Sequence, residues 1–225
     1  GKDQYHTSLA AMTGPGATAT ISWEYDVGIE YGSDYAVSQP VADSDGNIYF
    51  GIANNSSGKL VKLNKNGVKQ WEYSTNVSIG TPAVLSDGTV YFGRIGAGGS
   101  LAFTALNPDG SKKWDYDNAS TVQAVTVSPK GEPHFTYTSG IDKLTVLKTD
   151  GSEKVTISVT GLAGFAPVVL DDGTIITASN ISGNQQFTAY SATGSQSWQV
   201  FSTPDTYGNA PADPSYDKST GTTYS

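Results

Sequence analysis

The sequence lacks several features that would point to particular functions. It has no cysteine in 225 residues, which excludes a disulfide framework, a thiol nucleophile and a cysteine-based metal site. Arg94 is the only arginine and the net charge is −8, so we expect no nucleic-acid partner, because phosphate recognition prefers clustered arginine and lysine. No run of about 18 apolar residues is present, so we expect no membrane span. There is no signal-peptide pattern, but the chain starts at Gly1 without a methionine, which is compatible with the removal of an export signal.

Glycines recur along the chain at a nearly constant spacing. One series has spacings of 42, 43, 42 and 48 residues, and a second series has spacings of 43, 41 and 43. The first series is Gly46, Gly88, Gly131, Gly173 and Gly221, and the second is Gly67, Gly110, Gly151 and Gly194. Self-similarity at such a period indicates a tandem repeat of one supersecondary unit.

Each repeat holds four short β-type runs separated by turn residues. Asp-Gly and Asn-Gly steps between the runs supply the positive φ angles that tight hairpins need. The unit is therefore a four-stranded antiparallel meander, and a series of such units is typical of an all-β protein of the β-propeller class. The full repeats span about 37–73, 79–116, 122–158 and 164–201, with a partial fifth over 211–225 and an N-terminal strand over 21–27.

We interpret 1–225 as a single propeller domain and expect it to be a piece of a larger propeller, because the chain stops inside a strand-like run. Four residues after each glycine of the second series stands a large apolar residue: Trp71, Trp114, Val155 or Trp198. One meander cannot cover both of its faces, so these tryptophans, together with Trp23, are predicted to pack between blades, as structural residues alongside the turn glycines. Val155 stands at this position in the third full repeat and predicts a looser contact there.

Two segments carry a resemblance to a known family. PAVLSDGTVYFG (Pro82 to Gly93) and ALNPDGSKKW (Ala105 to Trp114) resemble the PQQ-like β-propeller repeat family. The lead-in from Asp3 looks like that of bacterial secreted members, in which an N-terminal strand typically closes the ring. The resemblance implies the fold over nearly the whole chain but not the function, because this family holds both enzymes and pure binding proteins.

The sequence departs from the enzyme branch of that family. Quinoprotein dehydrogenases carry a repeat of the type Ala-x-Asp-x-x-Thr-Gly-x-x-x-Trp, whereas the segment from Ala189 to Trp198 is one residue shorter and has Ser191 in place of the aspartate. Many of those enzymes also have a vicinal cysteine pair, which this chain cannot form. We therefore expect no cofactor, and no enzymatic activity.

Three groups of residues could bind a metal ion or take part in catalysis, but a structural role is favoured for them. Asp43 to Asn47 looks like the opening of a calcium loop, yet Asn54 stands where the final glutamate ligand is required, so we expect a hairpin turn and no metal site. His134 falls three residues after Gly131, as Tyr49 does after Gly46, which favours a packing position. Glu30 is the one glutamate in a long loop that would suit a carboxylate-based glycosidase.

The long loops on one face of the propeller are the expected place for binding, because function concentrates in loops on a rigid scaffold. Tyrosine and asparagine there suit a protein or glycan partner. The predicted ligand-binding residues are Tyr31, Asp34, Tyr35, Phe165, Tyr207 and Asn209. The sequence thus favours a non-enzymatic binding or scaffold module that is secreted, periplasmic or at the cell surface. The alternative is a quinoprotein-type oxidoreductase or a carboxylate-based glycosidase.

Overall fold

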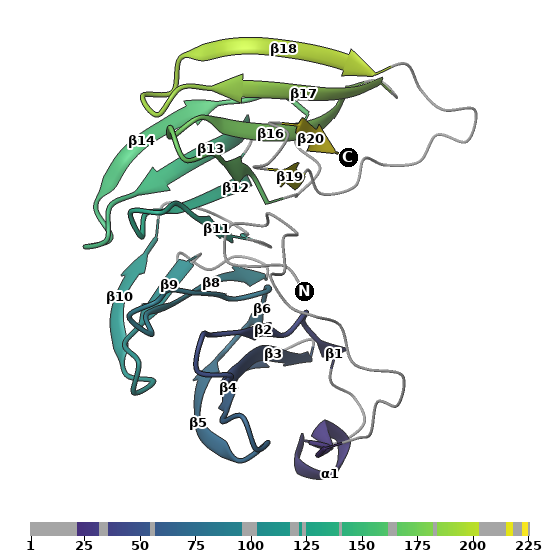
Figure 1. Cartoon of the computed structure of the whole chain (residues 1–225), viewed down its shortest axis with the longest axis vertical. Coiled ribbons are helices and arrows are strands. Elements are labelled where there is room, and N and C mark those ends of the chain that lie inside the picture. Colours follow the sequence, from purple (N-terminus) through teal and green to yellow (C-terminus); the bar gives the residue numbers. More distant parts are fainter. Residues whose placement is uncertain are drawn as a thin grey trace.

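The computed structural model of the chain is built almost entirely from β-strands in antiparallel sheets, and four of these sheets lie side by side along an arc (Figure 1). The one helix among the described residues is α1 (Val27–Tyr31). The structure describes residues 22–31, 36–54, 57–95, 103–117, 122, 125–139, 141–161, 166–181, 184–202, 215–217 and 222–224. No helix within this part of the chain is long and apolar enough to cross a membrane.

We number the four sheets blades 1 to 4 in chain order. Blade 1 contains β1 (Ala36–Val37), β2 (Val41–Ala42), β3 (Ile48–Asn54), β4 (Ser57–Leu63) and β5 (Lys69–Thr75). Blade 2 contains β6 (Ser78–Ile79), β7 (Ala83–Val84), β8 (Val90–Ile95), β9 (Phe103–Leu106) and β10 (Lys112–Tyr116). Blade 3 contains β11 (Val125–Val127), β12 (Pro133–Ser139), β13 (Ile141–Leu147) and β14 (Glu153–Ser158). Blade 4 contains β15 (Val168–Val169), β16 (Ile175–Ile181), β17 (Asn184–Tyr190) and β18 (Gln196–Ser202). β19 (Ser215–Asp217) and β20 (Thr222–Tyr224) pair with each other as a two-stranded sheet.

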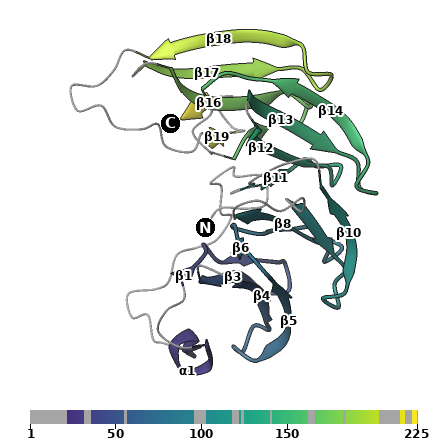
Figure 2. The ribbon, with the colours of Figure 1, turned by 180° about the vertical axis from the view of Figure 1, so that it is seen from behind.

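Within each blade the strands follow one another as an antiparallel meander, as the sequence predicts. The short first strands lie towards the concave side of the arc and the last strands, β5, β10, β14 and β18, lie along its outer rim (Figures 1 and 2). In blades 1 and 2 the innermost strand is split into two short pieces that both pair with the next long strand. Pro40 and Pro82 stand between these pieces, and proline has no N–H to donate to a ladder.

The predicted hairpin turns are confirmed. At Gly46, for example, φ is +81°, its N–H donates to the Asp43 carbonyl at 3.1 Å, and the Asp43 N–H donates to the Asn47 carbonyl at 3.0 Å. This is the three-residue loop in which a left-handed residue forms a bulge, and glycine adopts that conformation at little cost. The same bond pattern recurs in each blade, so the repeating glycines follow from the repeating turns.

Neighbouring blades meet through one recurring tryptophan contact. The indole N–H of Trp71 in blade 1 donates to the Pro108 carbonyl of blade 2 at 3.0 Å, and its ring covers Gly110. Trp114 in blade 2 repeats this contact with the Thr149 carbonyl of blade 3 at 3.0 Å. A β-carbon on the turn glycine would lie 2.7–2.8 Å from the ring, so a larger residue there would displace the indole.

The contact changes in blades 3 and 4. Val155 stands in the tryptophan position of blade 3, and its methyl group lies against Gly194 together with Ile157. Trp198 of blade 4 is 43% exposed, because none of the described residues covers it in this way. The wedge between blades is therefore tryptophan at the first two interfaces and aliphatic at the third.

The N-terminal segment differs from the strand that the sequence predicts over 21–27. Residues 22–26 have no regular secondary structure and α1 begins at Val27. The segment is held to blade 1 by side chains, since the Trp23 indole donates to the Lys65 carbonyl at 2.9 Å and its ring covers Gly67. It forms no ladder with another described strand, so a backbone pairing that would define a strand is missing.

Candidate binding site on the flank of blade 1

Of the six residues predicted to bind a ligand, the structure describes Tyr31, the last residue of α1. Its side chain is half-buried against blade 1. The other five predictions fall outside the described residues: Asp34, Tyr35, Phe165, Tyr207 and Asn209. The candidate site is therefore built from Tyr31 and from the flank of blade 1 on which α1 lies.

Tyr31 joins α1 to blade 1 through a cluster of charged side chains. Its hydroxyl donates to Glu72 Oε2 at 2.7 Å, and Lys59 Nζ donates to Glu72 Oε1 at 2.6 Å. Lys69 Nζ lies 3.2 Å from Glu72 Oε2. Both ammonium groups also lie near the tyrosine ring, 4.9 Å and 5.6 Å from its centroid, which is within the range of cation–π attraction.

These contacts fix the charge of the cluster. Hydrogen bonds from Lys59 and Tyr31 lower the pKa of Glu72 to about 2, so this carboxylate is ionised at neutral pH. Burial and the hydrogen bond to Glu72 raise the pKa of the Tyr31 hydroxyl, which therefore stays protonated. With two lysines against one glutamate, the cluster carries one net positive charge at neutral pH.

A groove of about 680 Å³ runs along the same flank. One wall is the N-terminal segment over 23–28 and the other is the face of blade 1 that carries Val37, Ile48, Phe50 and Leu63. The volume falls in the range of about 300–1,000 Å³ that ligand-binding pockets occupy. Val37 is 50% exposed, so part of the apolar floor is open to a partner.

Specific contacts join the two walls of the groove. Tyr25 packs edge-on against Phe50, with ring centroids 5.9 Å apart at 65°, next to the Trp23 contact with Lys65. The groove also reaches Gly28 in α1, and it carries Glu24 and Asp26 on the N-terminal wall. The arrangement is an apolar trough with acidic groups on one side and the Tyr31 cluster at the end of α1.

Asp43, the residue that suggests a calcium loop, uses its carboxylate to stabilise its own hairpin turn. Its carboxylate accepts hydrogen bonds from the backbone N–H groups of Asp45 and Asn47, from Asn47 Nδ2 and from the Tyr49 hydroxyl. Burial opposes ionisation of this carboxyl, but these hydrogen bonds outweigh it and the pKa of Asp43 is lowered. The same oxygens that a cation would need therefore hold the hairpin. Among the described residues, no group of three or more His, Asp and Glu side chains is placed to hold a metal ion.

His134 lies inside the stack of blades, with only 4% of its surface exposed. Its Nδ1 lies 2.9 Å from the Glu132 carbonyl. Burial lowers the pKa of the imidazole to about 4, so the ring is neutral at physiological pH. It lines a small cavity of about 90 Å³ between blades 3 and 4, beside the ion pair of Lys154 with Glu132. The side chain of Glu30 is not among the described side chains.

The sequence reasoning missed the groove and a buried ion pair. Arg94 and Asp115 approach at 3.4 Å in the interface between blades 1 and 2, and Lys112 holds the other oxygen of Asp115 at 2.9 Å. One pattern in the sequence could have indicated that the N-terminal segment packs on blade 1. Trp23-x-Tyr25 repeats the pattern of Trp71-x-Tyr73 and Trp114-x-Tyr116. The carbonyl groups that accept from these tryptophans, however, lie 35 to 42 residues further along, where only an alignment of the repeats would locate them.

Comparison with known proteins agrees with this architecture. The chain is similar to BamB from Moraxella catarrhalis, with 16% identity, a TM-score of 0.60, and coverage of 85% of this chain and 66% of that one. It is also similar to a catalytically inactive virginiamycin B lyase from Staphylococcus aureus, with 14% identity, a TM-score of 0.62, and coverage of 83% and 61%. A third similar structure is TolB from Acinetobacter baumannii, with 14% identity, a TM-score of 0.51, and coverage of 72% and 45%.

These identities are low, so the likeness establishes the fold alone, and the predicted all-β propeller with four-stranded blades is confirmed. The chain spans less than two thirds of the length of each of the three structures. No curated protein matches it. A family model described as outer membrane protein assembly factor BamB matches residues 97–220. This match covers more than half of the sequence, and the chain therefore belongs to that family of PQQ-like β-propellers.

Proposed function

We propose that the chain is a non-enzymatic binding or scaffold module that recognises a protein or glycan partner. The groove on blade 1 is the observation that carries this proposal, because it is preformed, apolar and partly open at Val37. Protein interfaces combine an apolar centre with a polar rim, and here Glu24, Asp26 and the Tyr31 cluster supply the rim. The family description as an assembly factor supports a protein partner over a glycan.

The proposed contact surface extends from the groove to the loops on one face of the propeller. α1 contributes Gly28 to the groove and Tyr31 to the charged cluster, and the chain then runs on to Asp34 and Tyr35. We assign further contacts to the other predicted loop residues, Phe165, Tyr207 and Asn209. A periplasmic, cell-surface or secreted location fits a partner-binding propeller of this family.

Four of the groups that could do chemistry are engaged in structural contacts in the described part of the chain. Glu72 and Asp115 are neutralised by lysines, Asp43 holds its turn, and His134 is neutral and buried. This favours binding over the alternative of a quinoprotein-type oxidoreductase or a carboxylate-based glycosidase. A thermal-shift screen separates the two: a rise in melting temperature with calcium and the quinone together would favour the enzyme, since a ligand stabilises the state that it binds.

The groove itself is tested with two matched variants. Val37 lies in the groove and is 50% exposed, whereas Val68 lies in the turn between β4 and β5 and is 57% exposed. We expect Val37→Asp to abolish retention of a specific protein from an extract of the source cells on the immobilised chain, and Val68→Asp to leave it unchanged. Equal retention by both variants would show that the groove is not the docking surface.

A further inference from the structure

Two large side chains at the interface between blades 2 and 3 have smaller equivalents between blades 3 and 4. Tyr91 stands three residues after its turn glycine, and His134 takes that place in blade 3. Trp114 stands four residues after a turn glycine of the second series, and Val155 takes that place in blade 3. The interface between blades 3 and 4 therefore lacks a phenol ring and an indole ring that the preceding interface has.

These two rings also donate hydrogen bonds to the backbone of the next blade. At the interface between blades 2 and 3, the phenol hydroxyl donates to the Gly131 carbonyl at 3.2 Å and the indole N–H donates to the Thr149 carbonyl at 3.0 Å. The equivalent carbonyls in blade 4 belong to Gly173 and Ala192. Among the described residues, no side chain donates to either of these two carbonyls.

The cavity of about 90 Å³ between blades 3 and 4 lies beside all of these groups. His134, Gly173 and Ala192 line it, together with the apolar side chains of Val146 and Val169. The two blades are neighbours along the arc, and the cavity walls include the turn between β11 and β12 and the turn between β15 and β16 (Figure 1). The volume is about that of one aromatic ring.

His134 offers the cavity a hydrogen-bond acceptor. Its Nδ1 lies 2.9 Å from the Glu132 carbonyl oxygen, which can only accept, so Nδ1 carries a proton. Because the ring is neutral at physiological pH, it holds that one proton and Nε2 keeps a free lone pair. Among the described residues nothing donates to Nε2, although the side chain is almost completely buried. A buried polar atom in this situation calls for a partner.

The free groups define the chemistry of that partner. Nε2 and the two carbonyls all accept hydrogen bonds, so the partner has to donate one. Burial keeps the imidazole uncharged, which favours a neutral donor over a cation. Among the charged lining residues, Lys154 is paired with Glu132 at 2.8 Å, whereas Lys130, Asp171 and Asp172 are exposed to water. The apolar walls favour a ring, since small-molecule sites combine apolar contact with a few placed polar groups.

We infer that the cavity between blades 3 and 4 is a binding site for a small neutral aromatic molecule that carries an O–H or N–H donor, such as a phenol. The ring takes the place that side-chain rings fill at the interface between blades 2 and 3, and its donor bonds to His134 Nε2 or to one of the two carbonyls. This site is separate from the groove on blade 1 and does not depend on the proposed function of that groove.

The nitrogen-15 NMR signals of the histidine rings test this site with phenol as the probe. The chain has two histidines, so His6 serves as the internal reference. At neutral pH we expect the Nε2 signal of His134 to start at the position of an unprotonated nitrogen and to move towards that of a protonated one, with a dissociation constant on the order of 1 mM. Toluene has nearly the same shape but no donor, and it should bind about ten-fold more weakly or worse. An unmoved Nε2 signal, as for a cavity that holds water only, or equal affinity for toluene would overturn the inference.

Two tryptophan variants locate the bound phenol. Val155→Trp supplies the missing indole and should prevent the change at His134. The matched control is Val68→Trp, at a residue that is 57% exposed in the turn between β4 and β5, and it should leave the change as it is in the wild type. His134→Tyr gives a second readout: phenol should raise the melting temperature of the wild type but not of this variant, because a ligand stabilises only the state that it binds. A response to phenol that persists in both Val155→Trp and His134→Tyr would place the ligand elsewhere and contradict the proposed site.

Discussion

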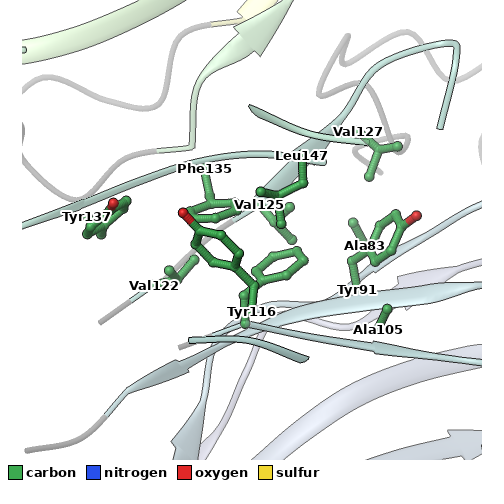
Figure 3. Close-up of a cluster of buried hydrophobic side chains, with 11 residues drawn as sticks. Ala83, Tyr91, Ala105, Tyr116, Val122, Val125, Val127, Phe135, Tyr137 and Leu147 are labelled. Carbon is green, nitrogen blue, oxygen red and sulfur yellow. The ribbon is translucent and has the colours of Figure 1, made fainter. Parts of the chain in front are cut away.

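The interface between blades 2 and 3 and the interface between blades 3 and 4 use equivalent strands but different side chains. The first is aromatic: Phe103 stacks on Phe135 with centroids 4.7 Å apart, and Trp114 and Tyr116 pack around them. Figure 3 shows the buried residues of this interface, with Tyr116 of blade 2 next to Phe135 and Val125 of blade 3. Two aromatic layers therefore fill the space between these blades.

The second interface is mainly aliphatic on the side of blade 3 and largely polar on the side of blade 4. Blade 3 contributes Leu144 and Val146, with Val155 and Ile157 partly buried. The opposing face of blade 4 adds Ile175 and Tyr190 to this cluster, but the rest of that face is polar, with buried Thr177, Ser179, Gln186 and Thr188. Two buried oxygen atoms at this interface, Thr126 Oγ1 and Gln186 Oε1, have no hydrogen-bond partner among the described residues. Leaving a buried polar atom unpaired costs roughly 1–3 kcal/mol.

The geometry of a blade therefore does not depend on one particular set of interface side chains. The turns at Gly151 and Gly194 have the same φ, +86° and +85°, although one is covered by an indole and the other by methyl groups. Hairpin turns and ladders set the shape of each blade, and the interface side chains then decide how strongly neighbouring blades adhere. The interface between blades 3 and 4 is accordingly expected to be the weaker one.

The largest effect on stability is expected at a position of the second strand that is aromatic in blade 3 and polar in blade 4. Phe135 in blade 3 and Thr177 in blade 4 both stand four residues after their turn glycine. We expect Phe135→Ala to lower the free energy of unfolding by about 3–5 kcal/mol, because a fully buried ring and its stacking partner are lost. Thr177→Ala should cost about 1 kcal/mol, since it removes one long hydrogen bond to the Thr188 carbonyl.

Urea unfolding of the two variants measures this contrast. Equal losses from both substitutions would show that the aromatic layer contributes no more to stability than a buried threonine.

A second, smaller effect concerns pH and is confined to the interface of blades 3 and 4. The pKa of His134 is about 4 in the folded chain and about 6.5 in an unfolded one, so the unfolded state binds a proton first as the pH falls. Stability is therefore greatest above pH 6.5 and falls as the pH drops from there towards 4. Between pH 7 and pH 5 the expected loss is about 2 kcal/mol.

The matched control is His134→Tyr, because Tyr49 and Tyr91 occupy this position in blades 1 and 2. This variant should show a much flatter dependence of the unfolding free energy on pH over the same range. Glu72, whose pKa is about 2, titrates below this window and leaves the comparison undisturbed. A wild type and a variant with parallel pH profiles would show that His134 is not the source of the dependence.

Much of the fold could be predicted from the sequence, because the repeat encodes it locally. Gly46 and Gly67 mark turns whose conformation needs glycine. Short strands joined by such tight turns pair with their neighbours in chain order, which gives a meander. The strand predicted over 21–27 was wrong, since a strand exists only where another strand pairs with it, and a single segment does not reveal its partner. The tryptophan contacts with Pro108 and Thr149 join residues more than 30 positions apart, so their partners could be placed only in three dimensions.

The candidate site was less predictable than the fold. Tyr31 stood out by its residue type, but its role depends on Glu72, Lys59 and Lys69, which reach it from blade 1. The groove depends on the separation between the N-terminal segment and blade 1, which no local pattern specifies. The groove lies where a segment outside the regular repeat packs on a blade. The sequence shows that this segment differs from the repeats, but not the shape of the surface that it forms.

The smallest effect comes from restoring the repeat at the weaker interface. The cavity of about 90 Å³ between blades 3 and 4 is lined by His134, Val146 and Ala192, which are equivalent to the residues around the indole of Trp71: Tyr49, Lys62 and Pro108. A tryptophan at Val155 would fill this space and could donate its N–H to the Ala192 carbonyl, as Trp71 donates to Pro108. We expect Val155→Trp to raise the free energy of unfolding by about 1 kcal/mol in urea titrations, from one hydrogen bond and added apolar burial, less the cost of moving Ile157 away from Gly194. Val155→Ala should instead lower it, and a tryptophan variant less stable than the alanine variant would show that this interface has adapted to the smaller residue and is not an unfilled copy of the other.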